Sequence, residues 1–376
     1  MAFRILSIDG GGLRGIVPAL VLKHVQDLSV ARRARNTVVV PADPASPDDA
    51  QFRIQNSFDL LAGASTGALI AAGLSVADRN IADPRHTIDD LIGVYRNRGK
   101  VIFPIKNRLH ACWRRQDFSY LFRPQFRPDG LDSVLRSLLY EPEPYSPTLW
   151  DCTRPLFICS YDLATNSPLI FTTRAALDNP KQNVKLIDAC RATSAGPTYL
   201  PPYRFALEHA HDRASTDTVT AIDGGIFMNN PAMAALMEVL SNQRGQFYDV
   251  PDLDLSDIYL LSIGTGHLPQ RIAERSRRWG RYGWIKPALE VMMWGSSQAV
   301  DDQVRTALGL RARSGRLNYL RINVEIKDRK FADMANSDAA SLKHMEERFE
   351  EDFMRNAFIQ DQLLLFIEHA ELDRAS

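Results

Sequence analysis

Ser65 stands in a short glycine-flanked turn whose residue types could support nucleophilic catalysis. The turn reads GASTG over residues 63–67 and follows a largely apolar run, residues 58–62, with the length of a buried strand. A G-x-S-x-G turn between a strand and a helix is typical of a nucleophile elbow, in which a strained backbone presents the serine hydroxyl at the edge of the sheet. Gly63 and Gly67 would leave room for that sharp turn. The pattern predicts a serine that attacks acyl groups.

A second glycine-rich turn, DGGGLRG at residues 9–15, could stabilise a reaction intermediate. It follows an alternating strand pattern and precedes a helical one. The backbone N–H groups of Gly10, Gly11 and Gly12 carry no side chains that would block an approaching oxyanion, and a helix N-terminus favours negative charge. Arg14 adds a positive charge beside them. These residues predict an oxyanion hole.

The same glycines also satisfy a dinucleotide-binding fingerprint. Gly10, Gly12 and Gly15 form G-x-G-x-x-G between a strand and a helix. That site needs an acidic residue about twenty positions further on, at the end of the next strand. The nearest candidate, Asp43, lies in the proline-rich stretch PADPASP, which cannot end a strand. The oxyanion hole is therefore the favoured interpretation, and we expect no cofactor.

Asp223 is the candidate partner of the serine. It ends a predicted strand at residues 218–222 and opens the sequence DGG, which leads into a helix. A serine hydroxyl is a weak nucleophile until a base within hydrogen-bond reach takes its proton, and a carboxylate can be that base. Gly224 and Gly225 would let the chain turn and keep the carboxylate accessible.

A histidine base is the open alternative. His267 follows a predicted strand at residues 258–263. In α/β-hydrolases the chain order is serine, acid, histidine, so order alone permits a triad of Ser65, Asp223 and His267.

The elements that must position these residues alternate between strand and helix patterns. This alternation predicts an α/β fold with a mostly parallel central sheet and helices on both faces. Sites assemble at the carboxyl ends of such strands. We expect a single domain over residues 1–376, with a flexible insertion at residues 31–56 and C-terminal helices at residues 325–376. Residues 60–77 carry no charge and are long enough for a membrane span, but their glycines and hydroxyls fit an elbow better.

The amino-acid composition limits which ligands and which cellular compartment the protein is expected to have. Lys+Arg and Asp+Glu balance at 45 each, so the overall charge does not favour nucleic acid. The four cysteines lack metal or disulfide spacing, and the N-terminus lacks the features of a signal peptide. We expect a cytoplasmic protein without a metal site, and the sequence leaves a homo-oligomer open.

A basic and aromatic segment spans residues 96–127. It contains nine Lys or Arg residues, among them Arg114 and Arg115, against one acid, Asp117, and is interleaved with aromatic residues. This composition suits a surface that meets anionic lipid headgroups. A nucleic-acid patch and a solvated loop with some buried aromatic residues are the alternatives.

The motifs together resemble those of the patatin-like phospholipases. The D-G-G-G-x-R-G loop corresponds to residues 9–15, the G-x-S-x-G elbow to residues 63–67 and the D-G-G motif to residues 223–225. The resemblance runs from Ile5 to about Phe366 and includes three further stretches, at residues 191–199, 261–266 and 318–322.

The resemblance implies a catalytic dyad of Ser65 and Asp223 without histidine, an oxyanion hole from the three loop glycines, and support of that loop by Arg14. It implies a hydrolase that releases fatty acids from membrane phospholipids through an acyl-serine intermediate, without metal. Such an enzyme would lie at the periphery of the inner membrane when active. A soluble carboxylesterase for small acyl esters and a catalytically silent lipid-binding protein are the alternatives.

Some bacterial members that the chain resembles are phospholipases activated by a cyclic nucleotide in antiphage defence. A basic cluster could bind such an anionic activator, although a solvated helix face explains it equally well. The cluster consists of Arg271, Arg275, Arg277, Arg278 and Arg281.

Overall fold

The computed structural model describes residues 2–36, 52–78, 83–104, 123–139, 145–207, 217–241, 248, 250, 253–269, 276–277, 280–309 and 315–373. Several of the expectations above fall outside these ranges. They are most of the predicted insertion, residues 105–122 of the basic and aromatic segment with Arg114 and Arg115, and three members of the arginine cluster, Arg271, Arg275 and Arg278.

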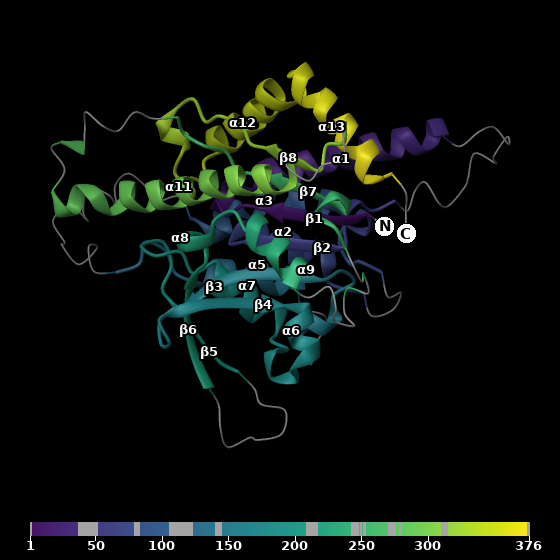
Figure 1. Ribbon diagram of the computed structural model, residues 1–376. Helices are drawn as coiled ribbons and strands as arrows, with labels where there is room; N and C mark the ends of the chain where they lie inside the picture. The colour runs from purple at the N-terminus through teal and green to yellow at the C-terminus, as the bar shows by residue number, and fades with distance from the viewer. Residues whose placement is uncertain are drawn as a thin grey trace.

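A sheet of eight strands organises the described part of the chain (Figure 1). The strand order is β5-β6-β3-β2-β1-β7-β8, and β4 pairs with β3 outside this path. The strands are β1 (Phe3–Ile8), β2 (Leu60–Ala64), β3 (Leu156–Asp162), β4 (Ser167–Thr172), β5 (Tyr203–Leu207), β6 (Asp217–Asp223), β7 (Ile258–Ile263) and β8 (Tyr319–Ile322).

The central strands β3, β2, β1, β7 and β8 are parallel, whereas β4, β5 and β6 pair antiparallel. The predicted α/β class is thus confirmed, with a mixed sheet. Sequence reasoning did not assign β5. Its alternation of Tyr203, Phe205 and Leu207 was the available signal, but the strand is short and half exposed.

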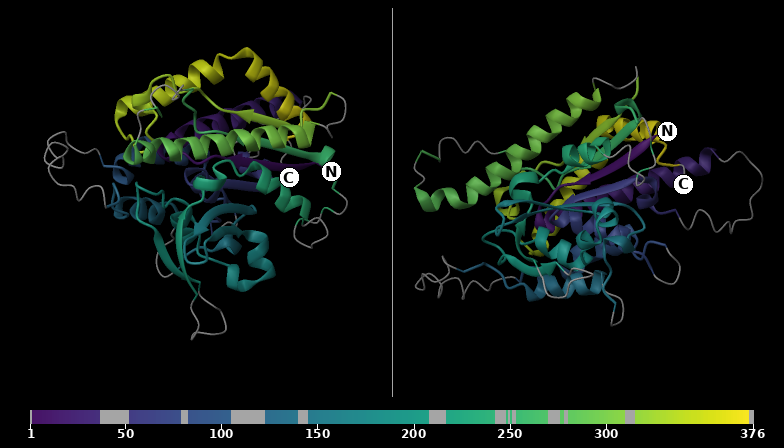
Figure 2. Two further views of the ribbon diagram at one scale, coloured as in Figure 1. Left: turned by 60° about the vertical axis from the view of Figure 1, so that its left-hand side comes forward. Right: turned by 60° about the horizontal axis from the view of Figure 1, so that its bottom comes forward.

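Helices cover both faces of the sheet (Figures 1 and 2). Alternate residues of one strand enter different cores: Leu6 packs into the core formed with α1, α2, α3, α5, α7 and α13, and Ile5 into the core formed with α9 and α11. The helices are α1 (Ile16–Asn36), α2 (Thr66–Ser75), α3 (Ile88–Ile102), α5 (Asp129–Leu139), α6 (Thr173–Asp178), α7 (Leu186–Thr193), α8 (Gly225–Met228), α9 (Ala232–Ser241), α11 (Arg281–Gly309), α12 (Ala339–Arg348) and α13 (Ala357–Ala370).

The uncharged stretch at residues 60–77 is not a continuous helix. It forms the buried strand β2, the turn at Ser65 and the buried helix α2. No helix within the described ranges is both long and apolar enough to cross a bilayer. α1 extends to Asn36, so the first residues of the predicted insertion are helical.

The register around β3 brings two distant segments together. One edge of β3 is occupied along its length by β4, from Phe157 to Asp162. β2 and β6 share the opposite edge: β2 ends where Ala64 pairs with Cys159, and the antiparallel β6 ends where Asp223 pairs with Ser160. Because Cys159 and Ser160 are consecutive, the residue after Ala64 must lie beside Asp223.

Candidate active site

Ser65 occupies the turn between β2 and α2 in a strained conformation. Its φ of 50° and ψ of −120° lie in a region that side chains rarely adopt. The flanking glycines allow the turn to pack closely against neighbouring backbone. A Cβ at Gly63 would collide with the backbone of Ala68, and a Cβ at Gly67 with the backbone of Ile8. The sequence therefore forms an elbow because no larger residue fits at either position.

Thr193, at the end of α7, holds the elbow in place. Its hydroxyl accepts a hydrogen bond from the Ser65 backbone N–H at 2.9 Å and donates to the Cys159 carbonyl at 2.5 Å. The Ser65 N–H is thus already bonded and is not a free donor. Sequence reasoning did not single out Thr193, although it lies in one of the stretches that carried the family resemblance.

Asp223 faces the same cavity as Ser65, with an empty volume of about 570 Å³. Burial raises the pKa of the Asp223 carboxyl to about 6, against the lowering effect of hydrogen bonds from the Gly225 N–H and the Ser65 side chain. The Gly225 N–H donates to Asp223 Oδ1 at 2.7 Å. At Gly224 a Cβ would collide with the Cys159 carbonyl, so this glycine allows the tight approach of β6 to β3.

The glycine loop lies against the same cavity. One of its three backbone N–H groups is already hydrogen-bonded within the protein. The Gly10 N–H donates to the Asn229 carbonyl at 3.1 Å. Those of Gly11 and Gly12, which line the cavity, have no acceptor among the described residues. Gly12 has φ of 59°, and its Cβ would collide with the Met334 carbonyl.

Two arginines act on this loop in different ways. Arg14 Nε donates to the Gly11 carbonyl at 3.4 Å, and burial lowers the Arg14 pKa. Arg321, on β8, forms a bidentate ion pair with Asp9 at 2.5 and 2.7 Å. Ser297 on α11 adds a hydrogen bond to Asp9 at 2.8 Å. Sequence reasoning missed Arg321 and Ser297, because nothing local connects them with a loop about 300 residues earlier.

Comparison with known proteins shows the family to which the chain belongs. Residues 6–236 match a family model described as "Patatin-like phospholipase". The chain belongs to the patatin-like phospholipase family. "Patatin-like protein 3" of Arabidopsis thaliana is 28% identical over 361 residues, which cover 91% of this chain and 78% of that protein. "Patatin-04/09" of Solanum tuberosum is 27% identical over 346 residues, which cover 90% and 80%.

Two further similarities have less bearing on activity. "Probable inactive patatin-like protein 9" of Arabidopsis thaliana is 30% identical, with 85% of this chain and 74% of that protein covered. Family membership therefore does not by itself establish turnover. The solved structure of VipD from Legionella pneumophila matches with a TM-score of 0.32 at 12% identity, covering 93% of this chain and 67% of that chain.

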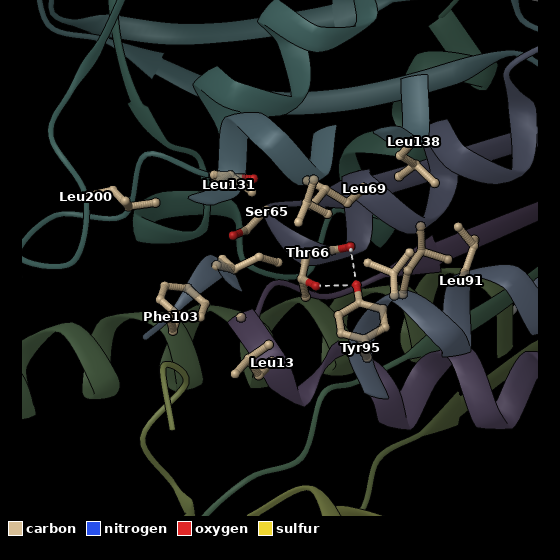
Figure 3. A pocket seen from close by; sticks show the side chains of 16 residues that line it. Leu13, Ser65, Thr66, Leu69, Leu91, Tyr95, Phe103, Leu131, Leu138 and Leu200 are labelled. Carbon is tan, nitrogen blue, oxygen red and sulfur yellow. Dashed lines mark hydrogen bonds between the residues drawn. The ribbon is translucent and has the colours of Figure 1, made fainter. Parts of the chain in front are cut away.

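An apolar pocket of this patatin-like fold extends from Ser65 between α2, α3 and α5, with an empty volume of about 590 Å³. Figure 3 shows Ser65 between Phe103 on one side and Leu91 with Leu138 on the other. Two polar groups in the wall satisfy each other, since the hydroxyls of Thr66 and Tyr95 are 2.5 Å apart, whereas the Ser194 hydroxyl is buried without a hydrogen bond among the described residues. Its remaining lining is almost entirely aliphatic or aromatic, which suits a hydrocarbon chain.

His267 lies elsewhere in the patatin-like fold. It stacks on Trp294 with ring centroids 4.5 Å apart and lines a third cavity, and it is absent from the lining of the two cavities that contain Ser65. β1 separates β7 from β2, so the strand that precedes His267 is not a neighbour of the elbow strand. Burial lowers the His267 pKa. Among the described residues, no three His, Cys, Asp or Glu side chains gather as metal ligands would.

Proposed function

We propose that this patatin-like protein hydrolyses the fatty acyl esters of membrane phospholipids with Ser65 as nucleophile and Asp223 as base. The observation that carries the proposal is the meeting of two cavities at Ser65. One contains Asp223 and the free glycine N–H groups, and the other is the apolar pocket. A carbonyl at Ser65 would have its base, its oxyanion donors and a place for its hydrocarbon chain around it.

In the first half of the reaction, Asp223 takes the Ser65 hydroxyl proton as the serine oxygen attacks the ester carbonyl. The N–H groups of Gly11 and Gly12 stabilise the developing oxyanion. The ester C–O bond then breaks, and the lysophospholipid oxygen leaves with the proton from Asp223.

In the second half, Asp223 deprotonates a water molecule that attacks the acyl-serine carbonyl. The acyl–oxygen bond to Ser65 breaks, the fatty acid is released, and the proton returns to the serine. The raised pKa of Asp223, about 6, suits this role, because a base with a pKa near the working pH both accepts and returns a proton readily.

The pocket favours a long acyl substrate over the small ester of a soluble carboxylesterase. Its wall is formed by residues from Leu91 to Phe103 along α3, about 18 Å at 1.5 Å per residue. A small acyl group would leave most of this apolar surface without contacts. The free N–H groups and the strained serine argue against a catalytically silent lipid-binding protein, since strain persists where function needs it.

Membrane contact is part of the proposal, and α11 supports it. Trp284 and Met292 are 41% and 48% exposed and share one stripe of the helix, with a spacing of eight residues. Leu289 and Met293, on the opposite stripe, line the cavity that contains Ser65. The N-terminal end of α11 stands clear of the sheet (Figures 1 and 2). We propose that this apolar face rests on the bilayer from the cytoplasmic side while the opposite face borders the active site.

Activation by a cyclic nucleotide, and with it a role in antiphage defence, remains a proposal that rests on the arginine cluster and on the resemblance. Of that cluster, the structure describes the side chain of Arg277, which is exposed. Titration of cyclic nucleotides into a vesicle hydrolysis assay tests it: activation supports the role, and rates unchanged by every nucleotide contradict it.

The central test compares the wild type with Ser65→Ala on phosphatidylethanolamine vesicles and on a short soluble ester. Ser137→Ala is the matched control, since its hydroxyl bonds only within α5 and lines none of the three cavities. We expect fatty acid release and a mass-detectable acyl-Ser65 adduct in the wild type and in the control, and neither in Ser65→Ala. Faster turnover of the short ester than of vesicles would favour the carboxylesterase, and no turnover of either would favour the silent protein.

A further inference from the structure

A third cavity opens between the glycine loop and α11, with an empty volume of about 910 Å³. It adjoins the cavity of Ser65 and Asp223, because Tyr199, Met293 and Met334 line both. Unlike the apolar pocket it is lined by charged and polar groups. They include Asp9, Arg14, Asn229, Thr265, His267 and Glu290.

Two opposite charges face this cavity without pairing. Arg14 and Glu290 have no ion pair within 4.0 Å, either with each other or with any other described residue. The side-chain contact of Arg14 is the long bond to the Gly11 carbonyl, at 3.4 Å. Burial lowers the Arg14 pKa, against the raising effects of Tyr199, Glu290, Asp333 and Asp9. Each charge can therefore accept a ligand group of opposite sign. Asp9, by contrast, is neutralised by Arg321.

Two further polar atoms in the wall lack partners. Asn229 is 7% exposed, and its Oδ1 is buried without a hydrogen bond among the described residues. His267 Nδ1 is buried and unbonded in the same way. Buried polar atoms in folded proteins normally have a partner, and here both residues line the cavity. Both atoms are buried within the wall, so the groups that the cavity offers to a ligand are the charges of Arg14 and Glu290.

We propose that this cavity binds the headgroup of a zwitterionic phospholipid, with the phosphate at Arg14 and the ammonium group at Glu290. The inference rests on the proposed function and names its substrate class. A phospholipid whose acyl chain fills the apolar pocket and whose ester lies at Ser65 must place its headgroup beyond the ester. The cavity across Met293 and Met334 is on that path. An anionic lipid without an amine would leave Glu290 uncompensated beside a second negative charge.

Headgroup preference tests the pairing. Vesicles of phosphatidylethanolamine and of phosphatidylglycerol with identical acyl chains are compared for the wild type, Glu290→Gln and the control Glu350→Gln, an exposed glutamate that lines none of the three cavities. We expect the wild type and the control to prefer the amine lipid. Glu290→Gln should reduce that preference about fivefold, as for a partly exposed charge pair. A preference unchanged in Glu290→Gln, or absent in the wild type, overturns the proposal.

A binding assay separates this inference from the catalytic one. Soluble glycerophosphoethanolamine and inorganic phosphate are titrated calorimetrically into Ser65→Ala, with and without Glu290→Gln. Binding of the headgroup that is weakened by Glu290→Gln supports the site even if no lipid is hydrolysed. Equal binding of inorganic phosphate, or no binding of either probe, overturns the zwitterionic headgroup.

Discussion

Asp9 and Arg321 form a buried bidentate ion pair that joins β1 to β8 across the intervening strand β7. The Arg321 guanidinium also donates a hydrogen bond to the hydroxyl of Ser262, on the intervening strand β7, at 2.7 Å. Their side chains are 4% and 7% exposed. Asp9 is the first residue of the glycine loop, so the pair fixes where that loop leaves the sheet. The aspartate of this motif is thus a structural anchor, whereas Gly11 and Gly12 line the cavity that contains Ser65.

Arg321→Met should destabilise the fold strongly, because it leaves the Asp9 charge buried and uncompensated. Loss of one partner of a buried pair costs about 3–5 kcal/mol. The double variant with Asp9→Asn should recover part of that loss, since no charge then remains. Urea unfolding of the wild type, Arg321→Met and the double variant measures the three free energies of unfolding. A double variant less stable than Arg321→Met would contradict this explanation.

Gly12→Ala should lower kcat more than the apparent affinity. Its φ of 59° and the nearby Met334 carbonyl force the loop to move, which displaces the N–H donors. Loss of one oxyanion donor costs about 2.7–4 kcal/mol, or about 10²–10³ in kcat. Gly295→Ala is the control, because a Cβ there meets nothing within 4 Å and alanine favours a helix. Near-normal kcat in Gly12→Ala would argue against a role for this loop in catalysis.

His267→Ala should retain most activity, whereas Asp223→Ala should be as inactive as Ser65→Ala. The reason is placement: His267 lines a cavity apart from the serine, and Asp223 shares its cavity. Steady-state rates on phospholipid vesicles measure the difference. If His267→Ala matched the serine variant, the triad would replace the dyad.

The pH profile of kcat/KM should follow the ionisation of Asp223. The base is competent only when deprotonated, so activity should be level above the pKa of about 6 and fall about tenfold per pH unit below it. A histidine base would titrate nearby, at about 6.5. The profile of His267→Ala therefore decides the assignment: the acidic limb should persist there unchanged.

The same carboxylate should reduce stability at neutral pH. Its pKa is about 6 in the folded chain and about 3.9 in the unfolded chain, so between these values the folded state binds more protons. The free energy of unfolding then falls as the pH rises from about 4 to about 6. Above about pH 6 the destabilisation by the ionised carboxylate is constant. Asp223→Asn should raise the unfolding free energy at pH 7.5 by about 1–3 kcal/mol, with no gain at pH 4. An equal or lower stability at pH 7.5 would refute this.

Replacing Trp284 by serine and Met292 by glutamine should weaken vesicle binding and leave turnover of a soluble ester unchanged. Both side chains are exposed and line none of the three cavities. Phe358→Ser on α13 is the control, since Phe358 is 71% exposed on another helix. Vesicle co-sedimentation measures the effect. If the Phe358→Ser control lost as much vesicle binding as the α11 variants, the idea that α11 contacts the membrane would be wrong. The same holds if the α11 variants lost as much activity on the soluble ester as on vesicles.

Local sequence determined the chemistry of the separate motifs. Gly63, Gly67 and Gly12 occupy positions where backbone crowding or a positive φ excludes other residues, and such requirements are visible in a few consecutive letters. The alternation of strand and helix patterns likewise determined the α/β class, because periodicity is local. Sequence also located Asp223 at a strand end, where a site can form.

The tertiary structure decided which of these motifs meet. Ser65 lies beside Asp223 because β2 and β6 share one edge of β3 in consecutive registers, which no single segment encodes. Arg321 reaches Asp9 over a separation of 312 residues, and Thr193 reaches Ser65 over 128. The physical reason is that sheet order and register follow from burial of the whole core, so a contact between distant residues exists only once every strand is in place.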